Sequence, residues 1–261
     1  MSSRRVAAVV RREVRDFRRN RFVIGTMAVM PLVFLITPLI TLFKIPDSAA
    51  GPQAKTVVGV ITLFLFIVPV VVPPVIAAYS IVGERDQGTL EPVLTAPIQP
   101  SELLLGKAVA VFIPAVAIAY AMYAVIAISI RVGAAPVVRT VVFHPPQVIA
   151  QVLFTPLLAA WSIWACIGIS TRVTDVRVGQ QLGTLAGLPL LGFTSLITFQ
   201  LITPTVLVAV GLALALLILD IAGWRIVSNL FDRERLITGQ TVRVTASDPP
   251  RSRRPPRGAI R

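Results

Sequence analysis

Charged side chains are rare in this chain, and acidic ones gather most densely in one polar stretch, residues 84–107. The stretch reads ERDQGTLEPVLTAPIQPSELLLGK and holds four of the twelve acidic residues, Glu84, Asp86, Glu91 and Glu102. Carboxylates at this density can pair with basic groups of another protein, or they can cap helices and hold the segment at a membrane surface. Both roles place the stretch in water, because one charge inside a bilayer costs about 2.5–3.5 kcal/mol.

The sequence lacks the residues that most catalytic sites need. A single histidine, His144, excludes a zinc site built on several histidines, and a single cysteine, Cys166, excludes an intramolecular disulfide. The one Gly-Lys pair, Gly106-Lys107, follows three leucines and does not belong to a phosphate-binding loop of the form GxxxxGK[ST]. We therefore expect no ATP hydrolysis and no covalent catalysis, and hence no enzyme activity, in this chain.

Composition predicts a membrane protein. Of the 261 residues 55% are hydrophobic, and the mean hydropathy is +0.81. The net charge of +13 could suit nucleic acid, but the basic residues concentrate at the two ends of an otherwise apolar chain. Anionic lipid headgroups are the simpler partner for such a distribution, so we expect contact with membrane lipids and not with nucleic acid.

Residues 1–21 have the pattern of an amphipathic helix. Val6, Val10, Val14 and Phe17 follow one another at helical spacing, and arginines recur at seven-residue intervals beside them. A basic helix with one apolar stripe is suited to lie in the headgroup plane. It either anchors the chain at the lipid surface or also contacts a partner subunit, and the sequence leaves both open.

Six hydrophobic runs follow, and together they predict an all-α membrane domain over residues 22–224. Each run reaches the roughly 20 residues that a helix needs to cross about 30 Å of hydrocarbon. The predicted spans are residues 22–43, 57–83, 108–130, 148–170, 181–201 and 204–224.

The distribution of lysine and arginine predicts the orientation. With the N-terminus inside, 21 of the 25 basic residues lie on the cytoplasmic side, and only Lys44, Lys55, Arg131 and Arg139 lie outside. We therefore expect a multi-pass protein of the plasma (inner) membrane with both termini in the cytoplasm. The cytoplasmic tail, residues 225–261, is rich in proline and arginine near its end and is predicted to be disordered from about residue 246.

Two of the spans contain unusual small or rigid residues. Pro69, Pro73 and Pro74 lie close together in the second span and predict a strong kink or a break there. In and just before the fifth span, small residues recur every four positions, a spacing that lets helices approach closely. These residues, Gly179, Gly183 and Gly187, could pack within the subunit or across a subunit interface.

Polar residues inside the spans are few. The outer end of the fifth span is the most polar, and its side chains could contact a substrate or bond to neighbouring helices; they are Thr194, Ser195, Thr198 and Gln200. Asp220 is the one acidic residue inside a span. It lies about one turn from Arg225, and we expect it to pair locally or to extend to the cytoplasmic edge of the membrane, with a proton or ion site as the alternative.

The polar stretch carries a resemblance to a known family. The run from Glu84 to Glu91, followed by Leu94, Pro97, Glu102-Leu103 and then Gly106-Lys107, resembles the pattern of ABC-2 type transporter permeases, roughly E-[RK]-[ED]-x-G-T-[LI]-E-x-L-L-x-x-P with a later Gly-Lys. The chain departs from the pattern at Pro92-Val93, where the family more often has a non-proline followed by leucine.

The resemblance implies a fold and a mode of action. It implies six membrane helices, an N-terminal interfacial helix, and a cytoplasmic coupling helix between helices 2 and 3 that contacts a separate P-loop ATPase. Two permease copies, or this chain and a sister permease, would form a dimer around the pathway. ATP and magnesium would bind the partner ATPase, with no cofactor in this chain. The implied coupling residues are Glu84, Arg85, Asp86, Gly88, Thr89, Leu90 and Glu91.

The resemblance also implies export, and the apolar spans suit a hydrophobic or amphipathic substrate such as a drug-like metabolite, a lipid or a peptide. Three other classes stay open. An energy-independent carrier or channel would need polar residues at matching depth in several spans. A membrane-embedded enzyme would need clustered acids or histidines. A scaffold subunit of a membrane complex makes no such demand.

Overall fold

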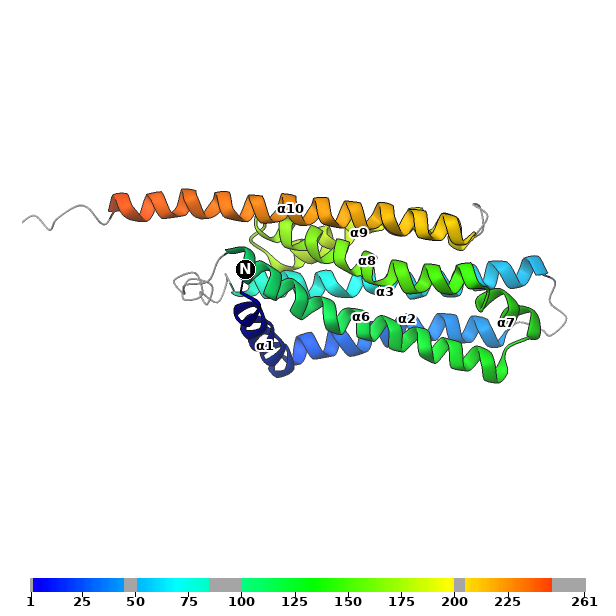
Figure 1. The fold of residues 1–261 in the computed structure, drawn as a ribbon. Helices are drawn as coiled ribbons and strands as arrows, with labels where there is room; N and C mark the ends of the chain where they lie inside the picture. Colours follow the sequence, from blue (N-terminus) through cyan, green and yellow to red (C-terminus); the bar gives the residue numbers. More distant parts are fainter. Residues whose placement is uncertain (1, 45–50, 85–99, 200–204, 246–261) are drawn as a thin grey trace, which may run out of the picture.

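The computed structural model describes residues 2–44, 51–84, 100–199 and 205–245, and within them it is helical throughout, with no strand. Figure 1 shows long helices running side by side, with the N-terminal helix, labelled α1, set across one end of the bundle. The elements are α1 Ser3–Arg19, α2 Arg21–Phe43, α3 Gly51–Ala78, the π-helix η1 Tyr79–Gly83, α6 Pro100–Gly133, α7 Pro136–Val142, α8 Pro145–Ser170, α9 Val176–Thr198 and α10 Val206–Thr245.

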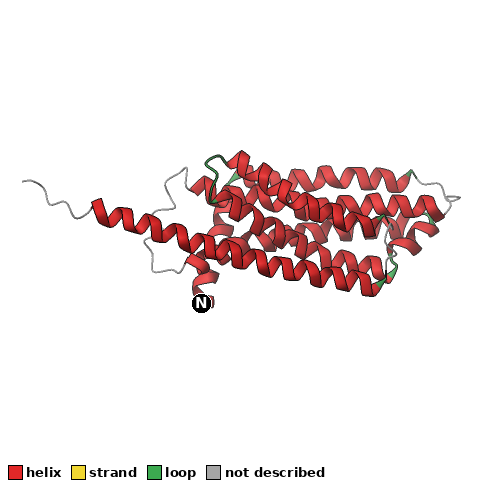
Figure 2. Ribbon diagram, turned by 90° about the horizontal axis from the view of Figure 1, so that it is seen from above, coloured by secondary structure: helices red, strands yellow, loops and turns green. Residues whose placement is uncertain are grey.

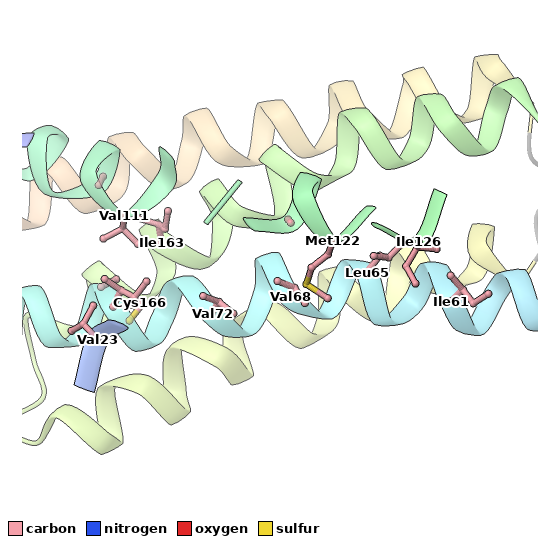
Figure 3. Packing of buried hydrophobic residues seen from close by; sticks show 14 of the residues in the cluster. Val23, Ile61, Leu65, Val68, Val72, Val111, Met122, Ile126, Ile163 and Cys166 are labelled. Atoms are coloured by element: carbon pink, nitrogen blue, oxygen red, sulfur yellow. The ribbon is translucent and has the colours of Figure 1, made fainter. Parts of the chain in front are cut away.

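Helix α3 forms the centre of the bundle. It lies against α2, α6, α8 and α9, and 72% of its most apolar stretch is buried, compared with 17% to 44% in the other candidate spans. Figure 3 shows Leu65 and Val68 of α3 close to Met122 and Ile126 of α6. Further along α3, Cys166 of α8 lies against it. The core is therefore built around α3, whose side chains are apolar on all sides.

The outer helices expose their apolar side chains. Leu32 on α2 is 60% exposed, and Leu207 and Ile218 on α10 are 83% and 67% exposed. A surface of this kind is stable only against an apolar solvent, because in water it would be an unusually large hydrophobic patch. These faces are therefore suited to contact lipid.

Five helices in the described residues are long and apolar enough to cross a membrane. They comprise Val23–Phe43, Pro52–Gly83, Ser101–Gly133, Pro145–Ser170 and Val206–Asn229. The predicted fifth span, 181–201, falls mostly on α9, which has 23 residues and packs on α3 and α8 but is not one of the five. Gln180, Gln181 and Thr184 near its start make it less apolar than the others.

Of the kink or break that the sequence predicted in α3, the break does not occur. The helix continues through Pro69, Pro73 and Pro74 to Ala78, and the irregularity comes just beyond, in η1. In a π-helix each bond spans five residues rather than four, so the switch from α-helical bonding disturbs carbonyl pairing nearby. Side chains of neighbouring helices supply donors there: Cys166 bonds to the carbonyl of Pro74 and Gln180 to that of Val75, each at 3.3 Å.

The two ends of the bundle differ. At one end lie α1, η1, the start of α6 and the extended end of α10, whereas α7 and the far end of α2 lie at the other (Figures 1 and 2). Helix α10 continues as a helix to Thr245, well beyond the predicted span 204–224. The predicted disorder from about residue 246 lies outside the described residues.

Candidate functional site

The candidate site is a cluster of buried charges where α1, η1 and α6 meet. The ammonium nitrogen Nζ of Lys107 lies 2.6 Å from Oε1 of Glu13 and 2.8 Å from Oε2 of Glu84. It also donates a hydrogen bond of 2.8 Å to the carbonyl of Ser80. Lys107 and Glu13 are each only 3% exposed. A single ammonium group therefore contacts two carboxylates and a carbonyl in a site that is largely shielded from water.

Helix α1 brings Glu13 to this cluster because Glu13 lies on its buried face. The buried residues of α1 are Val9, Glu13 and Phe17, each four positions apart. Of the predicted apolar stripe, Phe17 lies on this buried face, whereas Val6 and Val10 are partly buried and Val14 is exposed. The face that packs on the bundle contains a carboxylate that pattern reading left out.

Gly106 allows α1 to pack directly on α6. A Cβ atom at this position would lie 2.6 Å from both Cβ and Cγ1 of Val9, closer than real contacts allow. The absence of a side chain at Gly106 thus brings the two helices together, and Lys107 next to it reaches Glu13 at bonding distance. The Gly-Lys pair of the family pattern is here a packing contact followed by an ion-pair contact.

A second set of contacts holds the N-terminal end of α1. The backbone N–H of Ser2 donates to Oε1 of Glu102 at 2.6 Å, and Arg5 lies 3.5 Å from Oε2 of the same carboxylate, which is 1% exposed. At the other end of α1, Asn20 donates a hydrogen bond to the hydroxyl of Tyr79 in η1. Helix α1 is therefore fixed at both ends as well as at its middle.

The electrostatics of the cluster depend on burial. Removal from water raises the pKa of the Glu13 carboxyl above its ordinary value near 4.5, and the neighbouring Lys107 ammonium offsets only part of this effect. Glu84 is held on its other side by Arg12, whose guanidinium lies 3.8 Å away. A buried ion pair adds little net stability, but removing one partner is costly because the other charge stays buried.

Most of the coupling residues expected from the sequence lie outside the described residues. Of the seven, the structure describes Glu84, which takes part in the buried cluster. The other six belong to the segment 85–99 and are Arg85, Asp86, Gly88, Thr89, Leu90 and Glu91.

The three spaced glycines all face helices of the same chain. A Cβ at Gly187 would lie 2.6 Å from Val70 of α3, and one at Gly183 would lie 2.8 Å from Cys166 of α8. At Gly179 the nearest atom is the hydroxyl oxygen of Ser170, at 3.2 Å. Their small size therefore lets α9 approach α3 and α8 within one subunit.

The candidate substrate-path residues lie at the end of α9. The hydroxyl of Thr194 is buried and donates to the carbonyl of Leu191 at 3.0 Å, and that of Ser195 donates to Gly192 at 2.6 Å. Both hydroxyls thus bond within their own helix. The side chain of Thr198, and Gln200 as a whole, lie outside what the structure describes.

Asp220 does not form the expected pair with Arg225. Its side chain is buried, and neither carboxylate oxygen has a hydrogen-bond partner among the described residues. No ion pair joins Asp220 to Arg225 there either, although Arg225 is only five positions along the same helix. The spacing explains the difference, because side chains on one helix meet at three or four positions and not at five.

Replacing Asp220 by leucine is expected to raise the free energy of unfolding by about 1–3 kcal/mol, because an unpartnered polar group no longer has to be buried. Thermal unfolding of the purified protein in detergent measures this, with Asp16→Leu as the control, because Asp16 is exposed and its one ion pair, with Arg12 at 3.8 Å, lies on the surface. A clear loss of stability would contradict the prediction and would point to a binding partner for the carboxylate.

Sequence reading missed the members of the cluster outside the family pattern. Glu13 had a visible signal, since it is four residues from both Val9 and Phe17 and so shares their helix face. Lys107 and Glu102 were noted only as pattern positions, and no local signal connects them to α1. The carbonyl of Ser80 accepts a hydrogen bond from Lys107 only because the fold brings the two residues together.

These helices define the class of protein: a multi-pass helical membrane protein with lipid-suited outer faces and a charged cluster at one end of the bundle. The sequence profile of the ABC-2 family transporter proteins matches residues 7–222, and the chain belongs to this family. It is a transmembrane permease, a membrane transport subunit of a kind that typically works with an ATPase partner. No curated protein matches the chain closely enough to count as a relative.

Proposed function

We propose that this chain is the permease subunit of an ATP-driven exporter and that the stretch 84–107 receives force from a separate P-loop ATPase. The observation that carries the proposal is the position of Lys107, which bonds to Glu13 and Glu84 at 2.6 and 2.8 Å. Glu84 precedes the segment 85–99 and Lys107 follows it, so the ion pair ties the two sides of this segment together.

These ion pairs would let a force on the segment 85–99 move several helices at once. Glu84 follows η1 at the end of the central helix α3, and Lys107 belongs to α6, while Glu13 adds α1 to the same unit. A push on residues 85–91 would therefore move three helices together instead of bending one loop. In this proposal the charged residues of 85–91 pair with the ATPase, Leu90 fills an apolar notch on it, and Gly88 permits a tight turn.

The remaining parts of the proposal follow from this role. Helix α9 also crosses the membrane, as the fifth of six spans in chain order, and the end that holds α1, η1 and the end of α10 faces the cytoplasm at the plasma membrane. A second copy or a sister permease completes the pathway, ATP and magnesium bind the ATPase, and the substrate is hydrophobic or amphipathic. The second candidate, an energy-independent carrier or a scaffold subunit, is less well supported because buried ion pairs here tie the two sides of the loop together.

The test is co-purification of the tagged chain from its native membrane in mild detergent, with mass spectrometry of what accompanies it. The variant Leu90→Asp with Glu91→Arg changes the proposed contact. A matched variant, Arg177→Glu with Val178→Asp, makes the same kinds of change at an exposed position near the α8–α9 connector.

We expect a P-loop ATPase to accompany the wild type and the connector variant and to be lost from the loop variant. Loss from the connector variant instead would place the contact at the start of α9. If no ATPase accompanies the correctly folded wild type, the exporter proposal fails and the carrier or scaffold takes its place.

A further inference from the structure

Helix α1 has a second important face, which borders an open groove. The groove has a volume of about 1120 Å³ and runs between α1 and the first turns of α6. Its apolar lining comes from Val6, Val10 and Val14 on α1 and from Leu105 and Val109 on α6. Val14 is exposed and Val6 and Val10 are only partly buried, so these valines leave apolar surface facing the groove.

Arginines line the same groove. Arg11, Arg15, Arg18 and Arg19 lie along it at helical spacing, and no acidic residue is part of its lining. None of these four has an ion-pair partner within the described residues, whereas Arg5 and Arg12 pair with Glu102 and Glu84. The basic residues of α1 are thus divided between protein partners and an open groove that holds four positive charges.

The groove continues into an apolar pocket of about 410 Å³. The two cavities share Val14 and Arg18, and the second one extends between α2 and α6 past Phe17, Met27 and Ile113. Arg18 is its one charged lining residue. The surface therefore changes from basic to apolar in the direction that leads from α1 toward the membrane helices.

We propose that this groove binds one anionic glycerophospholipid, with its phosphate on the arginines and one acyl chain along the apolar pocket. The charge of the four arginines matches an anionic headgroup and gives no comparable gain with a zwitterionic one. The apolar continuation matches a hydrocarbon chain and would be of no use to a free phosphate. The inference rests on the membrane location of the helices and does not depend on the ATPase coupling.

The bound lipid would complete the packing of α1. On one face α1 is held by Glu13, Val9 and their partners on α6 and η1, whereas its other side borders the open groove. A lipid in the groove would fill this space and neutralise the arginines. The headgroup would then add a further contact that holds α1 at the membrane surface.

The test titrates the purified full-length chain in detergent with three probes and counts bound molecules by native mass spectrometry. The probes are phosphatidylglycerol, phosphatidylcholine with the same acyl chains, and glycerophosphoglycerol, which has the anionic headgroup without acyl chains. The variant Arg15→Gln with Arg18→Gln removes two groove charges, and Arg172→Gln with Arg177→Gln removes two exposed charges at the same end of the bundle.

We expect one phosphatidylglycerol to bind the wild type and to bind the groove variant about 30-fold more weakly, which corresponds to about 2 kcal/mol. The control variant should keep the wild-type affinity. Equal affinity for phosphatidylcholine, or equal weakening in both variants, would overturn the proposal. Equal binding of glycerophosphoglycerol would show a phosphate site without a lipid and would overturn it too.

A second pair of variants tests the acyl-chain path. Ala28→Phe adds a ring inside the apolar pocket, and Val29→Phe adds one on the exposed face of α2 next to it. Ala28→Phe should weaken phosphatidylglycerol binding while Val29→Phe leaves it unchanged. Unchanged binding by Ala28→Phe would show that the chain does not lie in this pocket, and melting temperatures of all variants would show that the fold is kept.

Discussion

Replacing Lys107 by methionine is expected to lower the free energy of unfolding by about 3–5 kcal/mol, the range seen when a buried ion pair loses one partner. Methionine keeps much of the length of the lysine side chain but not its charge. Glu13 and Glu84 would then face each other in a site where Glu13 is 3% exposed, without the cation that lies within 2.8 Å of both.

Denaturation of the purified protein in mixed micelles measures this loss, and Lys55→Met, at an exposed position on α3, is the control. The double variant Lys107→Met with Glu13→Gln should recover part of the stability. Burial raises the pKa of the Glu13 carboxyl, so its neutral amide analogue removes a charge that the site already disfavours. A single variant as stable as the control would show that the cluster is not a buried ion pair.

The raised pKa of Glu13 also sets the sign of its pH dependence. Between the ordinary value near 4.5 and the raised one, the folded protein holds a proton that the unfolded chain has released. The contribution of Glu13 to stability is therefore greatest at low pH and falls as the pH rises through the raised pKa. Glu13→Gln removes this part of the pH dependence.

The helices of this protein could be predicted from sequence because each is a long apolar run. A run such as the one that becomes α2 has few alternatives in a bilayer, where every backbone group must bond within its own segment. Three prolines in α3 did not end the helix, although Pro69, Pro73 and Pro74 each remove the backbone bond to the carbonyl four residues earlier. Side-chain donors from Cys166 and Gln180 bond to carbonyls further along, those of Pro74 and Val75, next to the π-helix η1.

The candidate site could not be predicted in the same way, because its members are far apart in the chain. Lys107 and Glu13 are 94 residues apart and Lys107 and Ser80 are 27 apart, so no periodic pattern connects them. The apolar stripe of α1 was read from its valines, and the buried face turned out to include a glutamate. A carboxylate on a buried helix face is stable only beside a cation, and the fold alone places that cation.

The family pattern included Gly106 and Lys107 of the candidate site, but it did not indicate what either residue does there. Gly106 and Lys107 directly precede the predicted span 108–130, and α6 runs through both of them from Pro100. The structure gives each residue a separate task. The glycine lets α1 approach, and the lysine then joins α1 to the end of α3.

In the proposed complex with an ATPase, replacing Gly106 by alanine is expected to reduce transport-coupled ATPase activity about 5- to 150-fold, the usual range of coupling between two sites. The added Cβ would lie 2.6 Å from Val9, and the atoms it meets include Cβ of Val9, which moves only if the backbone of α1 moves. A shift of α1 that relieves this contact also stretches the 2.6 Å bond between Lys107 and Glu13. Force from the loop would then no longer reach α1.

The measurement is ATP hydrolysis by the permease–ATPase complex in lipid vesicles, with and without transported substrate. Gly211→Ala is the control, because no atom lies within 4 Å of a Cβ there. The sharper test combines Gly106→Ala with Val9→Gly, which moves the side chain from one helix to the other and removes the atoms in conflict. A glycine inside α1 costs about 0.5–1 kcal/mol, so the double variant should be slightly less stable but should regain its coupling. If the double variant is as poorly coupled as Gly106→Ala, the close approach of α1 is not what transmits the force, and full coupling in Gly106→Ala alone would lead to the same conclusion.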